Sequence, residues 1–167
     1  ILLTGMVALG LLNIVEIKRN LDLSLLVLLV CSLAIGMALE KSGTAQLIAH
    51  GLITSAKSLG PVAMISSLFI VTLFLTQLIT NAAAVSIMFP IAMSMAQQLE
   101  LSYTPFFVAI AFAASGSFMT PIGYQTNLMV YGPGGYSFGD FAKVGVPLTI
   151  IYTVISIMFI SIYYNIY

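Results

Sequence analysis

The chain consists of long apolar stretches separated by short polar or glycine-marked segments. Residues 1–16 and 23–40 are two such stretches. The first ends in a polar cluster that contains Lys18, and the second ends in the segment 40–43, EKSG. A charged segment followed by glycine is typical of a helix end. The pattern therefore predicts one helix in each stretch.

The next segment, from Thr44 to Lys57, is amphipathic. Its sequence TAQLIAHGLITSAK places apolar residues at helical spacing with polar residues between them. It is too short and too polar to cross a membrane, so we expect an interfacial connecting helix. His50 belongs to this helix, and we expect it at the interface rather than in a proton relay.

The composition places these helices in a membrane. The 167 residues are 60% hydrophobic and 6% charged, and the mean hydropathy is +1.13. A soluble domain of this size needs more polar surface. Several stretches approach the roughly 20 residues that span a bilayer as a helix, and they lack the alternation of barrel strands. We expect an all-α, multi-pass protein in the lipid bilayer of the cell or inner membrane.

Charge and cysteine content exclude several functions. Five Lys and Arg balance five Asp and Glu, so the chain has no basic patch for nucleic acid. The single Cys31 excludes an intrachain disulfide and a cysteine-based metal site, and we expect no cofactor. The chain starts at Ile1 inside an apolar stretch, so it resembles a fragment whose first helix is cut, not a signal peptide.

Residues 62–98 are too long for one span, and the polar pair Thr80–Asn81 divides them into arms of about 17 residues, near the lower limit for a span. One interpretation is two spanning helices joined by a tight turn, although such turns usually contain Gly or Pro. The other is a re-entrant hairpin over residues 61–99 whose tip ends inside the membrane. Irregular backbone at that depth must be buried in protein or line a wet cavity.

A second interruption lies in the stretch 105–132, where TPIGYQTN follows an apolar run. Pro121 removes a backbone donor and Gly123 weakens a helix, which predicts unwinding over residues 120–126. A proline kink patched by neighbouring helices is the alternative. Two polar interruptions together favour a transporter, because transporter sites lie where membrane helices are discontinuous.

The helices that resume after these interruptions offer anion-binding ends. A helix N-terminus presents free N–H groups and about half a positive charge, so two such ends can hold a dianion without Lys or Arg. The expected starts and caps are Ala82 with Thr80 or Asn81, and Leu128 with Thr126 or Asn127. Amide, hydroxyl and carbonyl oxygens are also hard ligands, so we expect Asn81 and the Gly123 region to share a sodium ion. Ser115 and Ser117 are expected to serve helix packing, although they lie close enough to line the cavity.

These segments resemble the second repeat of the divalent anion:sodium symporters. TNAAAVSIMFPIA resembles the family's Ser-Asn-Thr hairpin tip, AASGSFMTPIGYQTNLMVYGPGGY its broken helix, and LLVCSLAIGMALEKSGTA the helix before its connecting segment. The resemblance implies the C-terminal half of an inverted-repeat transporter that works as a homodimer by elevator-like movement. The N-terminal repeat would then complete the site.

The resemblance also implies a division of the chain and a set of site residues. Residues 1–60 would form scaffold helices with the connecting helix, 61–139 the transport-type region, and 140–167 the final transmembrane helix. The expected substrate-binding residues are Thr80, Asn81, Tyr124, Thr126 and Asn127, and the expected sodium-binding residues are Thr76, Asn81, Gly123 and Gln125.

The string GYQTNLMVYGPGGY is most similar to a bacterial and algal-type branch of the family linked to sulfate, which implies sulfate as the substrate. Two departures from the family pattern argue against dicarboxylates such as succinate. Ala82 stands where the tip has Thr, and Tyr124-Gln125-Thr126 replaces the Thr-Pro-Pro of the dicarboxylate carriers. An exporter or exchanger on the same fold is the alternative, followed by a sensor that does not transport. An intramembrane enzyme is disfavoured because SFGD lacks a second membrane Asp and SGS lacks a nearby His.

Overall fold

The computed structural model describes residues 23–166, and every regular element in that range is helical. The elements are α3 Leu23–Lys41, α4 Thr44–Ala56, the short 3-10 helix η1 Lys57–Leu59, α5 Pro61–Thr76, α6 Asn81–Gln98, α7 Tyr103–Ser115, α8 Gln125–Tyr131 and α9 Phe138–Tyr163. The all-α prediction is confirmed for this range, and the helix predicted at residues 1–16 lies outside it.

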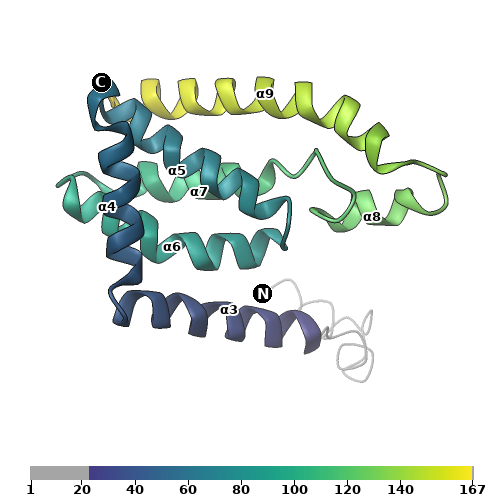
Figure 1. Ribbon diagram of the computed structural model, residues 1–167, viewed down its shortest axis with the longest axis horizontal. Helices are drawn as coiled ribbons and strands as arrows, with labels where there is room; N and C mark the ends of the chain where they lie inside the picture. The colour runs from purple at the N-terminus through teal and green to yellow at the C-terminus, as the bar shows by residue number, and fades with distance from the viewer. Residues whose placement is uncertain (1–22, 167) are drawn as a thin grey trace, which may run out of the picture.

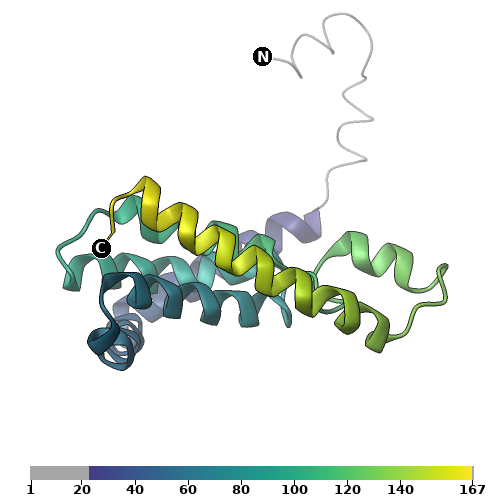
Figure 2. The same cartoon turned by 90° about the horizontal axis from the view of Figure 1, so that it is seen from above.

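Helix α6 lies at the centre of the bundle. It packs against α3, α4, α5 and α7, while α9 packs against α5 and α7. Helices α3, α5, α6, α7 and α9 run roughly along one direction, and α4 crosses one end of them (Figure 1). The view from above shows α9 lying along the bundle and α8 beyond the ends of α5 and α7 (Figure 2). The breaks between helices therefore lie along α9, part of the way down its length.

Local sequence signals explain the helix ends. Gly43 and Gly60 take positive φ values of 75° and 89° before α4 and α5, a conformation that favours glycine. Pro61 occupies the first turn of α5, where its missing N–H costs no hydrogen bond. Thr80 caps α6, because its Oγ1 accepts a hydrogen bond from the Ala83 N–H at 3.3 Å. Of the two predicted caps, Thr80 and Asn81, the structure has Thr80, and the helix begins at Asn81, one residue before the predicted Ala82.

Small residues allow the helices around α6 to approach closely. Ala45 and Ala49 of α4 and Ala92 and Ala96 of α6 are fully buried. A Cβ added to Gly36 of α3 would lie 2.9 Å from a backbone oxygen of α6, so only glycine fits there. Close approach through small residues is the usual packing mode of membrane helices.

Within residues 23–166, one helix is long and apolar enough to cross a membrane, namely α9, while α5 and α7 are apolar but shorter. The predicted start of this helix at residue 140 is wrong by two residues. Ser137 and Asp140 form a capping box, in which each side chain bonds the backbone N–H of the other, and this starts the helix at Phe138. The helix ends at Tyr163.

Candidate functional site

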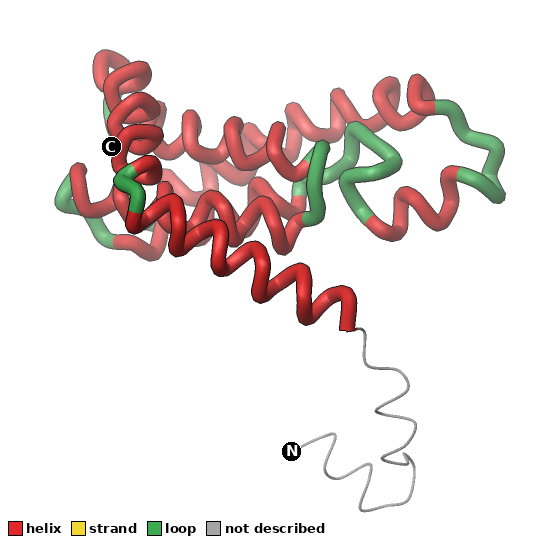
Figure 3. The backbone as a smooth tube through the Cα atoms, turned by 60° about the horizontal axis from the view of Figure 1, so that its bottom comes forward, coloured by secondary structure: helices red, strands yellow, loops and turns green. Residues whose placement is uncertain are grey.

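Both predicted interruptions are breaks in the helices, and they lie side by side. Residues 77–80 separate α5 from α6, and residues 116–124 separate α7 from α8. Figure 3 shows both breaks as loops between helix ends. Hydrogen bonds from Thr76 and Gln77 to the end of α7 join them directly. The two breaks therefore form one structural unit.

At the centre of this unit lies a cluster of four oxygen atoms, which we call the oxygen cluster: Thr76 Oγ1, Asn81 Oδ1, Ala114 O and Ser117 Oγ. Asn81 Oδ1 accepts hydrogen bonds from Thr76 Oγ1 at 2.8 Å and from Ser117 Oγ at 2.9 Å. The Ala114 carbonyl oxygen lies 2.9 Å from the Thr76 hydroxyl and 3.2 Å from the Ser117 hydroxyl. The two hydroxyl oxygens lie 3.1 Å apart.

The oxygen cluster has more acceptors than protons. Five oxygen pairs lie within hydrogen-bonding distance, but the two hydroxyls carry only one proton each. Thr76 is fully buried and Ser117 is 3% exposed, so water has little access to their hydroxyls. Lone pairs that have no proton to accept are suited to a hard cation.

The prediction that the chain unwinds over residues 120–126 is wrong in its bounds, because the non-helical segment is 116–124. The reason lies in tertiary hydrogen bonds. Gln77 Nε2 donates to the Gly116 carbonyl oxygen at 3.0 Å, and the Thr76 hydroxyl lies within bonding distance of the Ala114 carbonyl. Thr76 and Gln77 thus donate to carbonyl oxygens that would bond backbone N–H groups if helix α7 continued.

Gly123 lies close to the oxygen cluster. A Cβ at this position would stand 3.1 Å from the Thr76 carbonyl oxygen and 3.2 Å from Ser117 Cβ. The Gly123 N–H donates to Thr120 Oγ1 at 3.0 Å, and Thr120 donates in turn to the Gln77 carbonyl at 3.0 Å. The structure therefore brings together three of the predicted sodium-binding residues, Thr76, Asn81 and Gly123.

Gln125 is not part of this group. It is the first residue of α8 and is exposed. The predicted substrate-binding residues Thr80, Tyr124 and Thr126 are also exposed, with Tyr124 at 51%. Thr80 adjoins Asn81 at the start of α6, whereas Tyr124 and Thr126 lie at the start of α8.

The prediction that Thr126 or Asn127 caps a helix starting at Leu128 is wrong. Helix α8 begins at Gln125, and the residue before it makes no side-chain cap. Asn127 instead donates from Nδ2 to the carbonyl oxygens of Ser117 at 2.9 Å and Thr120 at 3.1 Å. Its amide nitrogen therefore ties α8 to the break, which stabilises an early start of the helix.

Gln77 was not among the predicted site residues, and Ser117 was expected to serve helix packing while lying close enough to line the cavity. Gln77 is 4% exposed and Ser117 is 3% exposed, and both bond across the two breaks. The available signal was their position: each is a polar residue inside an otherwise apolar run, directly beside an interruption.

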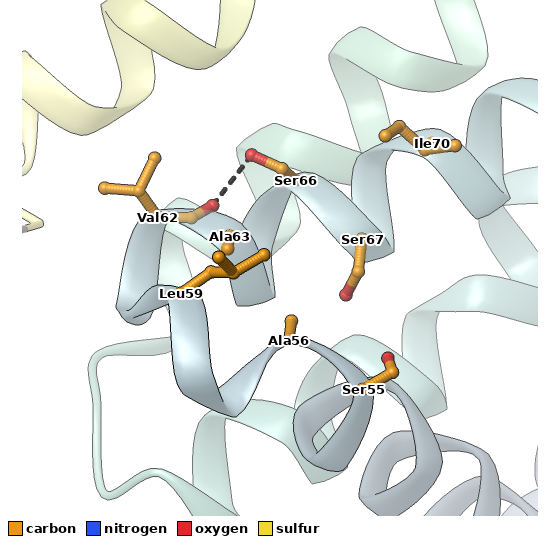
Figure 4. A pocket seen from close by; sticks show the side chains of 8 residues that line it. All are labelled: Ser55, Ala56, Leu59, Val62, Ala63, Ser66, Ser67 and Ile70. Atoms are coloured by element: carbon orange, nitrogen blue, oxygen red, sulfur yellow. Dashed lines mark hydrogen bonds between the residues drawn. The ribbon is translucent and has the colours of Figure 1, made fainter.

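The rest of the described chain has no metal-binding cluster and has an open hollow away from the breaks. No group of three or more His, Cys, Asp or Glu residues that would hold a metal lies within residues 23–166. An open hollow of about 480 Å³ lies between the end of α4, η1 and the first turns of α5 (Figure 4). Its serines 55, 66 and 67 donate to carbonyls of their own helices. Their hydroxyl protons are thus already engaged, and the hollow lies away from the breaks.

An all-helical, apolar chain with two adjoining helix breaks lined by oxygen atoms has the features of a membrane transporter. The chain belongs to the citrate transporter family, whose profile matches residues 1–166. This confirms the predicted resemblance to the divalent anion:sodium symporters at the level of the family. The family is integral to the membrane, and the three relatives described next are named as transporters rather than enzymes.

Three curated relatives illustrate the similarity. A protein named Uncharacterized transporter from Synechocystis sp. is 41% identical over 97% of this chain and 26% of its own length. Sodium/sulfate cotransporter 1 of Chlamydomonas reinhardtii is 34% identical over 93% of this chain and 18% of its own length. Sodium-dependent dicarboxylate transporter SdcS of Staphylococcus saprophyticus is 27% identical over 78% of this chain and 25% of its own length. The chain thus spans about a quarter or less of these relatives.

Proposed function

We propose that the full-length protein is a secondary active transporter that couples sodium entry to uptake of a small divalent anion, with sulfate favoured over dicarboxylates. The single observation that carries this proposal is the buried oxygen cluster, which is short of protons and lies where two helices break. Relatives named as sodium/sulfate and sodium-dependent dicarboxylate transporters support the choice of cation and anion.

The length of helix α9 allows the depth of this site in the membrane to be proposed. Its 26 residues make a helix about 39 Å long at 1.5 Å per residue, enough to cross a hydrocarbon core of about 30 Å. Tyr152 lies 14 residues after Phe138, about 21 Å along the helix and therefore near its middle. A Cβ on Gly116 would lie 3.2 Å from the Tyr152 ring. If α9 spans the bilayer, the break at Gly116 lies near the midplane.

Helix lengths support the re-entrant hairpin. The 16 residues of α5 and the 18 of α6 give about 24 and 27 Å, both shorter than the hydrocarbon core. In Figure 1 the hairpin opens toward the end of α9 that carries the C-terminus, and its tip points along α9 toward the other end. We therefore propose that residues 61–99 enter and leave on one side, with the tip at 77–80 near the midplane.

The proposed anion site lies at the start of α6. This helix begins at Asn81 and presents its positive end beside the oxygen cluster, where a bound sodium ion would add a full charge. Helix α8 has only seven residues and contributes a smaller dipole than the sequence prediction assumed. The proposed contacts of the anion stay as predicted, and Gln125 stays a proposed contact near the ion. The contacts of the anion are Thr80, Asn81, Tyr124, Thr126 and Asn127.

The proposed movement follows the division of the chain. Residues 61–139 would form the moving transport region and 1–60 the scaffold, with 140–167 as the final transmembrane helix. We propose elevator-like movement in a homodimer, completed by a second repeat elsewhere in the full-length protein.

The test is uptake of radiolabelled sulfate into proteoliposomes that contain the purified full-length protein. We expect uptake driven by an inward sodium gradient and absent when potassium or choline replaces sodium. Excess unlabelled sulfate should compete more strongly than succinate, and the reverse order would make the substrate a dicarboxylate. Uptake that is independent of sodium would refute the coupling. Uptake only against preloaded anion would indicate the alternative, an exchanger.

A further inference from the structure

Within residues 23–166, Gln77 carries a buried acceptor atom that has no hydrogen-bond partner. Its side chain is 4% exposed, and its Nε2 donates to the carbonyl oxygens of Gly116 at 3.0 Å and Leu73 at 3.4 Å. Its Oε1 is buried and makes no hydrogen bond. Buried polar atoms are nearly always paired, and an unpaired acceptor is unfavourable. Gln77 Oε1 would therefore be stabilised by a partner that donates a hydrogen bond or carries positive charge.

The orientation of this amide is determined by its surroundings. If the amide were turned over, Oε1 would face the carbonyl oxygens of Gly116 and Leu73, which have no proton to donate. The nitrogen must therefore face these carbonyls, and the oxygen must point to the unpartnered side. The fold holds an acceptor, rather than a donor, in that place.

Gln77 also adjoins the oxygen cluster on both chain segments. It follows Thr76 directly, and its partner Gly116 directly precedes Ser117. Residues 72–86 and 113–127, which contain both breaks, include no Lys, Arg or His. A positively charged partner for these oxygens would therefore come from outside these segments, and a small hard cation suits amide, hydroxyl and carbonyl oxygens together.

We propose that Gln77 Oε1 is a further ligand of the sodium ion, in addition to the oxygen cluster. The inference rests on the proposed function for the identity of the cation, but it concerns a residue that the resemblance did not assign. It predicts that sodium affinity, rather than anion affinity, depends on the oxygen atom at position 77.

Two variants separate the acceptor from the donor. Gln77→Met keeps the length of the side chain but removes both polar atoms. Gln77→Glu keeps an oxygen and, when ionised, replaces the donor to Gly116 with a second oxygen and adds a negative charge. The control is Gln97→Met on the exposed side of α6. Sodium binding is measured in two ways on the full-length protein: as the sodium concentration for half-maximal sulfate uptake, and as the sodium-dependent shift of melting temperature in detergent without anion.

We expect the half-maximal sodium concentration to rise at least tenfold in Gln77→Met, with the thermal shift lost, and to change less than threefold in the control. Gln77→Glu should keep the sodium-dependent thermal shift, because its carboxylate still offers an oxygen to the cation. Equal impairment of the Met and Glu variants would assign Gln77 to a structural clamp and overturn the inference, as would an unchanged Gln77→Met variant. If Gln77→Met does not fold, Gln77→Asn, which withdraws the oxygen by one carbon, replaces it with the same expectation. A wild-type protein that shows the thermal shift but no uptake would refute the proposed function alone.

Discussion

Replacing Asn81 with Ala removes the atom on which both hydroxyls of the oxygen cluster converge. The structural cost should be small. Thr76 Oγ1 and Ser117 Oγ lie 2.9 and 3.2 Å from the Ala114 carbonyl oxygen, so each hydroxyl still has an acceptor within hydrogen-bonding distance. Each neutral hydrogen bond contributes about 1 kcal/mol to the free energy of unfolding, and the remaining acceptor offsets part of that loss. We expect the variant to lose about 1 kcal/mol and to fold.

The cost to sodium binding should be larger. Mutation of residues that merely orient a metal ligand typically lowers affinity by about 10- to 100-fold. Asn81 Oδ1 is proposed as a direct ligand, so we expect at least this loss, which corresponds to about 1.4–2.8 kcal/mol. The assay is the sodium dependence of sulfate uptake by the full-length protein in proteoliposomes, with the melting temperature measured alongside. The half-maximal sodium concentration should rise at least tenfold above that of the wild type, while the melting temperature shows that the protein stays folded.

Ser86→Ala is the matched control for this variant. Ser86 lies in the same helix, and its hydroxyl donates to the carbonyl of its own helix at Ala82. It should leave sodium dependence unchanged. If Asn81→Ala takes up sulfate with a half-maximal sodium concentration within twofold of the wild type, the assignment of sodium to the oxygen cluster is refuted, whatever the effect on the maximal rate.

Two further predictions concern the packing of the breaks. Gly145→Val should destabilise the protein by about 1–3 kcal/mol and lower its melting temperature. A Cβ at this position would lie 2.8 Å from Met119 Cα and 2.6 Å from the backbone carbonyl carbon of Phe118. Gly139→Ala is the control, since its nearest neighbour is a side-chain oxygen at 3.6 Å, and equal effects would refute the close approach. Asn127→Ala should cost about 1–3 kcal/mol and raise hydrogen–deuterium exchange over residues 117–127, because two partly buried carbonyls lose their donor; unchanged exchange would contradict this role.

The positions of the two breaks were predictable from local sequence. Thr80 and Asn81 interrupt an apolar run, and a Thr in that place is a good N-cap, which the structure confirms. Pro121 and Gly123 located the second break in the same way. Such signals act within a few residues, so they need no knowledge of the tertiary fold.

The extent of the second break was not predictable in this way. Helix α7 stops at Ser115, five residues before the predicted unwinding, because side chains of α5 bond its last carbonyls. Nothing near Gly116 in sequence reveals that Gln77 will reach it. For the same reason Ser117 looked like a packing residue, since a hydroxyl in an apolar helix has the same local pattern whether it bonds its own helix or another.

The oxygen cluster also suggests how the two ions of the proposed function are coupled. Without a cation, Asn81 and its neighbours present oxygen lone pairs beside the start of α6, and these oppose the half charge of the helix end. A dianion approaching the empty site would therefore gain little. Sodium bound at the oxygen cluster cancels the negative field and adds a full positive charge in a region of low dielectric constant, where the attraction between charges is strong. The affinity for the anion then depends on the sodium ion, and by linkage the sodium ion is held more tightly once the anion is bound. Because the ligands are neutral, sodium binding changes the electrostatic potential at the anion site by a large amount. A permanent Lys or Arg would attract the anion whether or not sodium were present.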